Sequence, residues 1–300
     1  MARFSSAFLV AAFAFTLGHG PAPAFAQSQP PNVRFDASGI TDPAEYQAYI
    51  EALGTSNPFT IDKFVKRYPQ SLALQQVLEH AIAPSLESTE YIWSYWASGD
   101  DEILAFAERL HEMAPGDVRA LAVITTFDAK RVAIGRRDVI PKMCSDSQSG
   151  LKQLSHWGVP DGMTRSEFRA LRNNMSYTFN VFAGQCSFLE KDFVVARRFF
   201  RSATQVFPAR LVGVYGLTLS DLQEPIDPLG FVYCGKAVQL LKQTGGDGRR
   251  SATYLATYCR AVSRRVHHTG ENQTAGQPSA GQTLPPDLLA LDGNNIAKPH

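Results

Sequence analysis

Apolar residues recur along this chain at the spacing of an α-helix, and this periodicity constrains the fold more than any other feature. Tyr46, Tyr49, Ile50 and Leu53 follow the i, i+3, i+4, i+7 pattern that places side chains on one helix face. No stretch of useful length shows the alternation that is typical of a strand. The sequence therefore predicts an all-α chain of consecutive helices joined by short loops. The further stripes are Ile61, Phe64, Val65, Tyr68; Leu74, Val77, Leu78, Ala81; Thr89, Ile92, Trp93, Trp96; Ile103, Ala107, Leu110, Met113; and Val118, Leu121, Thr125.

Two of the expected helices carry explicit start signals. Asp42 precedes Pro43, and an acid follows three residues after the aspartate, as at a capped helix start. Gly54 then predicts the end of this helix. Thr164 and Glu167 form a T-x-x-E capping box before a long helix.

The first 26 residues have the layout of a secretory signal peptide. Arg3 precedes the short apolar run AFLVAAFAFTLG, and Ala24-Phe25-Ala26 is a small-x-small cleavage signal. No later stretch reaches the length of about 18 apolar residues that a spanning helix needs. We therefore expect an exported protein, periplasmic or secreted, without membrane insertion after cleavage; the alternative is an anchor that is never cut.

The composition along the chain predicts its organisation. The stretch after Cys144 is rich in Ser, Gly, Asp and Pro, with room for a short helix at Leu151–His156. The end of the chain is polar, Gly- and Pro-containing and without period, which is typical of disorder. We expect a signal peptide at 1–26, a flexible leader at 27–40, N-terminal helical repeats at 41–143, an insertion or loop at 144–163, C-terminal helical repeats with a capping helix at 164–267, and a disordered tail at 268–300.

One 34-residue stretch that begins at Tyr177 resembles a tetratricopeptide repeat. Small residues at two positions would let two antiparallel helices approach closely, aromatic and small residues would fill the space against the next pair, and a proline would end the second helix. The resemblance implies a tetratricopeptide-like solenoid of antiparallel helix pairs; the alternative is an irregular helical bundle. The matching residues are Gly184, Phe193, Ala196, Phe200, Ala203 and Pro208.

The resemblance is incomplete. Asn180, Ser187 and Lys191 stand where the family pattern has other residues. Residues 96–117 look like a second copy, and 64–69 and 231–241 are weaker echoes. In such a solenoid each repeat buries its face only against its neighbours, so the copies are expected to stack.

The four cysteines predict disulfides. They form no C-x-x-C motif, and an even number in an exported chain indicates up to two bridges. If the helices around Gly246 form a hairpin, Cys234 and Cys259 lie at the same height on adjacent helices, which is within reach of a disulfide. Cys144 and Cys186 then remain as the second pair; the alternative is four free, buried thiols.

The sequence contains no recognisable catalytic, cofactor or metal motif. There is no G-x-S-x-G, Walker loop or G-x-G-x-x-G, and His111-Glu112 lacks the second histidine of H-E-x-x-H. His267 and His268 are adjacent and would point about 100° apart on a helix, so they do not favour one metal ion. We therefore expect no enzyme, no cofactor and no metal.

The charge balance excludes another class of partner. The chain has 29 Lys and Arg and 28 Asp and Glu, and one base, Arg3, lies in the signal peptide. A chain without basic excess does not favour nucleic acid or an anionic membrane surface. A net charge near zero does favour self-association.

The family resemblance implies a groove lined by the first helix of each pair. In the best-matching unit the expected lining residues are Thr178, Val181, Gln185 and Phe188. Members that bind a peptide carboxylate hold it with lysine and asparagine there, whereas this chain has Val181 and Gln185, which argues against that mode. Trp93 and Trp96 are either exposed anchors for a peptide or core residues.

These expectations lead to three functional hypotheses. The first is an exported, non-enzymatic scaffold that binds a protein or peptide through a helical-repeat groove. The second is a structural or assembly factor of the cell envelope that acts as an oligomer. The third is an enzyme with an unrecognised site in residues 144–165, and fold resemblance alone does not choose among them.

Overall fold

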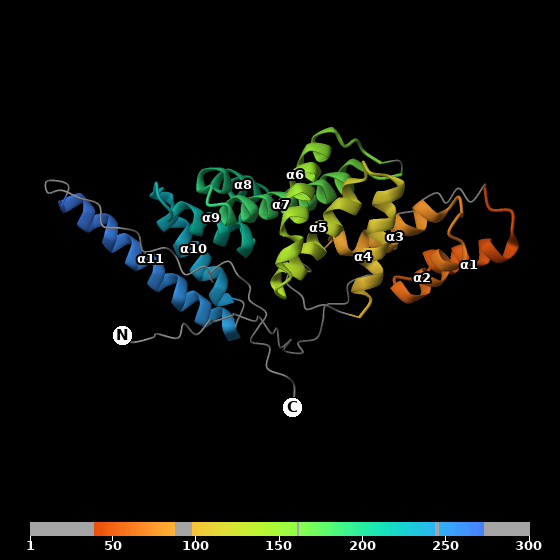
Figure 1. The fold of residues 1–300 in the computed structure, drawn as a ribbon, viewed down its shortest axis with the longest axis horizontal. Helices are drawn as coiled ribbons and strands as arrows, with labels where there is room; N and C mark the ends of the chain where they lie inside the picture. Colours follow the sequence, from red (N-terminus) through yellow and green to blue (C-terminus); the bar gives the residue numbers. More distant parts are fainter. Residues whose placement is uncertain (1–38, 88–97, 161, 244–245, 273–300) are drawn as a thin grey trace, which may run out of the picture. The chain divides into compact units, whose positions relative to one another are not determined.

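The described part of the chain is all-helical, as the apolar periodicity predicts. The computed structural model describes residues 39–87, 98–160, 162–243 and 246–272, which contain eleven α-helices and no strand (Figure 1). The helices are α1 Pro43–Leu53, α2 Pro58–Arg67, α3 Leu74–Glu87, α4 Asp100–Met113, α5 Val118–Ala133, α6 Ile140–His156, α7 Arg165–Leu189, α8 Phe193–Val206, α9 Leu211–Asp221, α10 Leu229–Gln243 and α11 Gly246–Asn272, with a 3-10 turn at Arg137–Val139.

Some expectations lie outside the described residues. These are the signal peptide at 1–26, most of the leader, the stripe with Trp93 and Trp96, and the tail from residue 273. The end of α11 corrects one boundary, because residues 268–272 continue the helix instead of beginning the tail.

The expected helix starts form as the sequence signals indicate. The Asp42 carboxylate accepts a hydrogen bond from the Ala44 N–H at 2.9 Å, and Gly54 ends α1. At the start of α7 the Glu167 carboxylate accepts from the Thr164 N–H at 2.8 Å, and Thr164 Oγ1 accepts from the Glu167 N–H at 3.3 Å. This reciprocal pair is a capping box, and the hydrogen bonds from Thr164 lower the pKa of Glu167.

The loop expected at 144–163 is wrong for residues 144–150, which belong to α6. The same helix continues over residues 151–156, where the sequence leaves room for a short helix. Ser147 is buried and donates its hydroxyl to the Met143 carbonyl at 2.6 Å, so its polar group is satisfied within the helix. Gly150 faces the Phe179 ring so closely that a Cβ at this position would overlap it. The small and polar residues of this segment therefore serve close helix packing and do not form a loop.

The chain divides into two compact units. The N-terminal unit contains the described residues up to Lys130 together with Pro141–Phe179, and the C-terminal unit contains Arg131–Ile140 and the residues from Asn180 onwards. Long α7 supplies residues to both units.

The N-terminal unit has an apolar core and a buried ion pair. In the core, the Phe64 ring lies 6.4 Å from the ring of Tyr49 and 5.4 Å from that of Tyr68. Lys130 Nζ of α5 lies 3.0 Å from Asp100 Oδ2 at the start of α4, and both side chains are buried. Burial lowers the pKa of Lys130, and the Asp100 carboxylate opposes this by stabilising the ammonium. The pair thus joins α4 to α5 through charges that would be unfavourable if buried alone.

The C-terminal unit is organised around the Phe200 ring of α8. The ring is fully buried against Gly184 of α7, where a Cβ would lie only 3.0 Å away. On its other side a Cβ at Gly216 of α9 would overlap the ring. Ala196 and Ala203, one turn before and one turn after Phe200, are also fully buried. One aromatic side chain between two glycines therefore allows three helices to pack closely.

The remaining helices of this unit follow one another as packed neighbours. Helix α8 packs on α9, α9 on α10, and α10 on α11. Phe193, the first residue of α8, places its ring 5.1 Å from that of Phe188 at the end of α7. Pro208 follows the end of α8 directly, where Phe207 is the C-cap.

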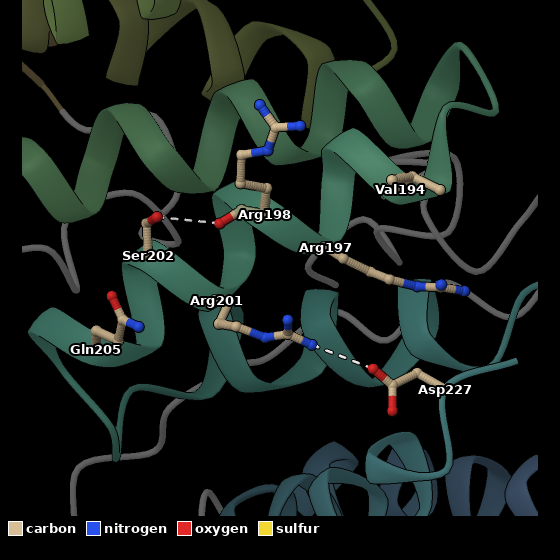
Figure 2. A pocket seen from close by; sticks show the side chains of 7 residues that line it. All are labelled: Val194, Arg197, Arg198, Arg201, Ser202, Gln205 and Asp227. Atoms are coloured by element: carbon tan, nitrogen blue, oxygen red, sulfur yellow. Dashed lines mark hydrogen bonds and ion pairs between the residues drawn. The ribbon is translucent and has the colours of Figure 1, made fainter.

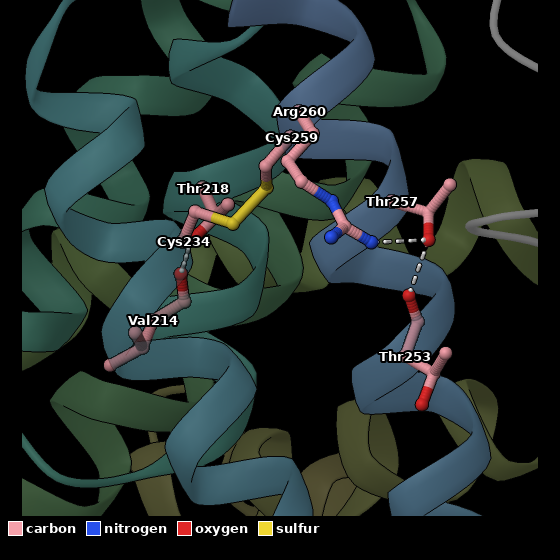
Figure 3. The surroundings of a disulfide bond; sticks show 7 residues. All are labelled: Val214, Thr218, Cys234, Thr253, Thr257, Cys259 and Arg260. Atoms are coloured by element: carbon pink, nitrogen blue, oxygen red, sulfur yellow. Dashed lines mark hydrogen bonds between the residues drawn. A yellow bond between two sulfur atoms is a disulfide. The ribbon is translucent and has the colours of Figure 1, made fainter.

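A disulfide joins Cys234 of α10 to Cys259 of α11, with Cα atoms 6.6 Å apart (Figure 3). This is the pair that the expected hairpin of the two helices indicates. Cys144 and Cys186 are also disulfide-bonded, so none of the four cysteines is free. On the loop-entropy account, a bridge across this separation of 25 residues stabilises by about 3 kcal/mol.

Replacing Phe200 tests the packing of α8. We expect Phe200→Ala to lower the free energy of unfolding by about 3–5 kcal/mol, because it removes a large buried ring and leaves a cavity between two glycines. Val194 on the same helix is 56% exposed, so Val194→Ala should change it by no more than about 0.5 kcal/mol. Urea denaturation followed by circular dichroism measures both, and equal effects of the two substitutions would contradict the packing role.

Candidate functional site

A shallow hollow on the exposed side of α8 brings three arginines together (Figure 2). Its volume is about 450 Å³. Positions 194, 198, 201 and 205 lie on one helix face because they are three or four residues apart. This arginine hollow is lined by Val194, Arg197, Arg198, Arg201, Ser202 and Gln205 of α8 and by Asp227 from the segment between α9 and α10.

Arg197 fixes one wall of the hollow. Its guanidinium donates to the backbone carbonyls of Ser220 at 3.0 Å and Gln223 at 2.7 Å, and to that of Pro225. Most of its side chain is buried. Charge-assisted hydrogen bonds to three carbonyls hold the chain after α9 against α8, so Arg197 has a structural role here.

Asp221 lies buried behind the arginines. Its Oδ1 is 3.5 Å from Arg197 Nε and 4.0 Å from an Arg201 nitrogen, and neither carboxylate oxygen accepts a hydrogen bond among the described residues. Burial, with repulsion from Asp227, raises the pKa of Asp221 to about 6, although the two arginines act in the opposite direction. The hollow therefore has a carboxyl group that titrates near neutral pH beneath it.

Arg201 and Arg198 face the solvent. Arg201 is 3.2 Å from Asp227 Oδ2 and remains partly exposed, while Asp227 Oδ1 accepts from the Leu229 N–H at the start of α10. Figure 2 shows the Arg198 side chain extending away from Asp227. No acidic side chain among the described residues forms an ion pair with Arg198, so its guanidinium is available to an external anion.

This arrangement suits the binding of carboxylates or phosphates. A guanidinium presents a planar fork of N–H donors that matches the oxygens of these anions in pairs. Ser202 and Gln205 add a hydroxyl and an amide beside it, although the Ser202 hydroxyl already donates to the Arg198 carbonyl at 3.0 Å. Exposed Val194 contributes the one apolar side chain of the lining.

The expected groove on α7 is not an open surface. Thr178 is buried and donates its hydroxyl to the Asn174 carbonyl at 3.0 Å, Val181 is fully buried, and Phe188 belongs to the core of the C-terminal unit. Gln185 is partly buried, and Trp93 and Trp96 lie outside the described residues. The prediction that Thr178, Val181 and Phe188 line a groove is therefore wrong, because α7 is buried on most of its circumference between residues 175 and 188.

In the sequence, Arg197, Arg198 and Arg201 form a short basic cluster that is interpreted as a solvated face, because acids elsewhere in the chain balance its charge. That interpretation considered charge over the whole chain and did not predict the hollow. Residues 180–272 contain twelve Lys and Arg and seven Asp and Glu, whereas residues 39–130 and 141–179 together contain eleven and seventeen. A count for each unit separately would have indicated a basic C-terminal unit and an acidic N-terminal unit.

A metal site and a membrane-spanning helix are both absent from the described residues. These residues contain no group of three or more His, Cys, Asp or Glu side chains that could hold a metal ion, and no helix among them has the length and apolar character to span a membrane. In comparisons with known proteins, no family model, no curated protein and no solved structure matches the chain.

The buried Asp221 predicts a specific pH dependence of stability. Because its pKa in the folded protein lies above the ordinary value of 3.8, the native state binds a proton between about pH 4 and pH 6 that the unfolded state has released. The stabilisation due to protonated Asp221 is therefore lost as the pH rises through this range. We expect the free energy of unfolding of Asp221→Asn to rise relative to that of the wild type by up to about 3 kcal/mol between pH 4 and pH 6.5, measured by urea denaturation.

A suitable control is Asp138→Asn in the same unit. The Arg136 guanidinium lowers the pKa of exposed Asp138, so this group titrates below the range tested. Its difference from the wild type should stay flat above pH 4. Parallel curves for wild type and Asp221→Asn would show that the carboxyl does not titrate in this window.

Proposed function

We propose that this protein is an exported, non-enzymatic binding scaffold whose arginine hollow receives an acidic segment of a protein partner. The observation that carries the proposal is the pair Arg198 and Arg201, which lie one turn apart on the outer face of α8. Asp227 and buried Asp221 lie near Arg201, and no acid pairs with Arg198 among the described residues. Two guanidinium groups at this spacing can engage two carboxylates of an extended acidic peptide.

The surroundings of the pair favour binding, since the helix that carries both arginines is held in place before a partner arrives. Phe200 fixes α8 on its buried side, and Arg197 ties α8 to the chain after α9. A preorganised site loses less conformational entropy on association than a flexible one. The hollow is shallow, and polar and charged residues make up most of its lining, which suits a peptide segment better than a small molecule that must be enclosed.

A tetratricopeptide-like stacking of α7 to α11 is part of the proposal. Gly184, Ala196, Phe200 and Ala203 lie at the packing positions of that repeat, and each helix from α8 onward packs on its successor. Such repeats present extended surfaces to partners. The proposed binding surface differs from the α7 groove that the resemblance implies, because that face of α7 is buried.

The disulfides indicate an oxidising environment, and from this we infer that the protein is exported. Disulfides persist in periplasmic and extracellular proteins and are rare in the cytosol. Together with the signal-peptide layout of residues 1–26, they favour a periplasmic or secreted protein. For the enzymatic alternative, residues 144–156 form a packed helix, so we place no site there.

The proposal is tested with a fluorescein-labelled peptide of alternating Glu and Ala, whose binding is followed by fluorescence anisotropy. We expect Arg198→Ala/Arg201→Ala to weaken binding at least about tenfold, because it removes both exposed charge-assisted donors. Higher salt should weaken binding of the wild type as well, since the site is exposed.

The matched control is Lys236→Ala/Lys242→Ala on α10. These two lysines are exposed and lie in the same unit as the hollow, and replacing them removes the same amount of positive charge. Binding by this variant should remain within about twofold of the wild type, since long-range effects of exposed charges are screened. Equal weakening by the two variants would mean that net charge, and not the hollow, attracts the peptide.

A further inference from the structure

Helix α11 carries a basic stripe on the face that points away from its core contacts. Its buried side is formed by Ala252, Leu255, Cys259 and Val262, which pack in the core of the C-terminal unit. The opposite face is exposed. We call it the basic stripe; its residues are Arg249, Thr253, Thr257, Arg260 and Arg264.

Hydrogen bonds within the helix order this stripe (Figure 3). The Thr253 hydroxyl donates to the Arg249 carbonyl at 3.0 Å, and the Thr257 hydroxyl donates to the Thr253 carbonyl at 2.9 Å. Arg260 in turn donates to Thr257 Oγ1 at 3.3 Å. The disulfide through Cys259 fixes the helix from its other side, so the arginines project from a rigid support.

The arginines of the stripe have no acidic partner among the described residues. The sequence contains no Asp or Glu between residues 248 and 266, and Arg249, Arg260 and Arg264 form no ion pair in the described part of the structure. Three positive charges along one exposed face therefore attract a complementary negative surface.

Helix α4 of the N-terminal unit carries a stripe of the opposite charge. Asp101, Glu108 and Glu112 are exposed on the face opposite to Leu104, Ala107 and Leu110, which are buried in the core. Among the described residues, Glu112 alone of the three forms an ion pair, with exposed Arg109 of the same helix at 2.9 Å. We call Asp101, Glu108 and Glu112 the acidic stripe.

We propose that the basic stripe of one copy docks on the acidic stripe of a second copy of this chain. At 1.5 Å per residue, the acidic stripe is about 17 Å long and the basic stripe about 23 Å, so their charges can face one another along a helix pair. The two units also have opposite charge, while the whole chain is close to neutral, so net repulsion does not oppose association.

The proposed contact is a docking between two different surfaces. A contact of this kind is head-to-tail, because in a pair one copy keeps its acidic stripe unused and the other keeps its basic stripe unused. The stripes contain no large apolar side chain, so the association is electrostatic and should weaken as salt screens the charges. This inference is independent of the arginine hollow, which lies on α8.

The test is sedimentation velocity of the purified chain. At about 20 mM salt we expect species larger than one chain, and at about 0.5 M salt one chain only, because the Debye length falls several-fold. Arg260→Glu/Arg264→Glu gives a chain with two acidic stripes, and Glu108→Lys/Glu112→Lys gives a chain with two basic stripes. Each variant alone should sediment as a single chain at low salt.

A mixture of the two variants makes the prediction specific. One retains the native acidic stripe and the other the native basic stripe, so the mixture should associate at low salt although neither variant does so alone. A chain with all four substitutions should regain self-association. The control Glu51→Lys/Lys236→Glu, which reverses one exposed acid on α1 and one exposed base on α10, should associate like the wild type.

Three results would overturn the proposal. The first is a wild-type chain that remains single at low salt, and the second is a mixture of the variants that forms no pair. The third is binding of the basic stripe to vesicles that contain phosphatidylglycerol, combined with unchanged self-association of Arg260→Glu/Arg264→Glu. In that case the stripe would face an anionic lipid surface and not a second copy.

Discussion

The contact of the Phe200 ring with Gly184 and Gly216 is the constraint on which the C-terminal unit depends. A side chain larger than hydrogen at either glycine would meet the ring, and a smaller residue at 200 would leave a void between three helices. The axial positions of α7, α8 and α9 are therefore fixed together. The Cys234–Cys259 disulfide supplies a second fixed point farther along, between α10 and α11.

This packing determines what α8 presents to solvent. Since Ala196, Phe200 and Ala203 turn inward, positions 194, 198, 201 and 205 must turn outward, and two of these are arginines. Arg197 lies between the two faces and donates to carbonyls in the last turn of α9 and directly after it. The same helix thus connects the core to the proposed binding surface. In α11, the disulfide fixes the buried face to α10, and the opposite, exposed face carries the basic stripe.

The sequence predicts those parts of the fold that depend on neighbours along the chain. The Asp42 cap and the Thr164–Glu167 capping box form because each involves residues two or three apart. The Cys234–Cys259 pair follows from counting along two adjacent helices. In the same way, the pattern of Phe200 with flanking alanines depends only on the helical period.

The features that the sequence did not predict depend on distant contacts. The segment around Ser147 and Gly150 has loop-like composition, but Gly150 packs against Phe179 of another helix, which local composition does not encode. Val181 and Phe188 were expected at a surface, and tertiary packing buries them. The roles of Gly216 and Asp221 likewise arise only when α8 and α9 are brought together. The two charged stripes lie in different units, and their opposite charges cancel in the net charge of the whole chain.

Native-state hydrogen exchange of the helix amides tests most directly whether Phe200 makes the C-terminal unit one cooperative body. If it does, the most protected amides of α8, α9 and α10 will exchange with the same free energy of opening, because none of these helices can open without releasing the ring or its glycine contacts. If the amides of α8 instead exchange through an opening that requires about 2 kcal/mol less than that of α9 and α10, the central packing role assigned to Phe200 is contradicted.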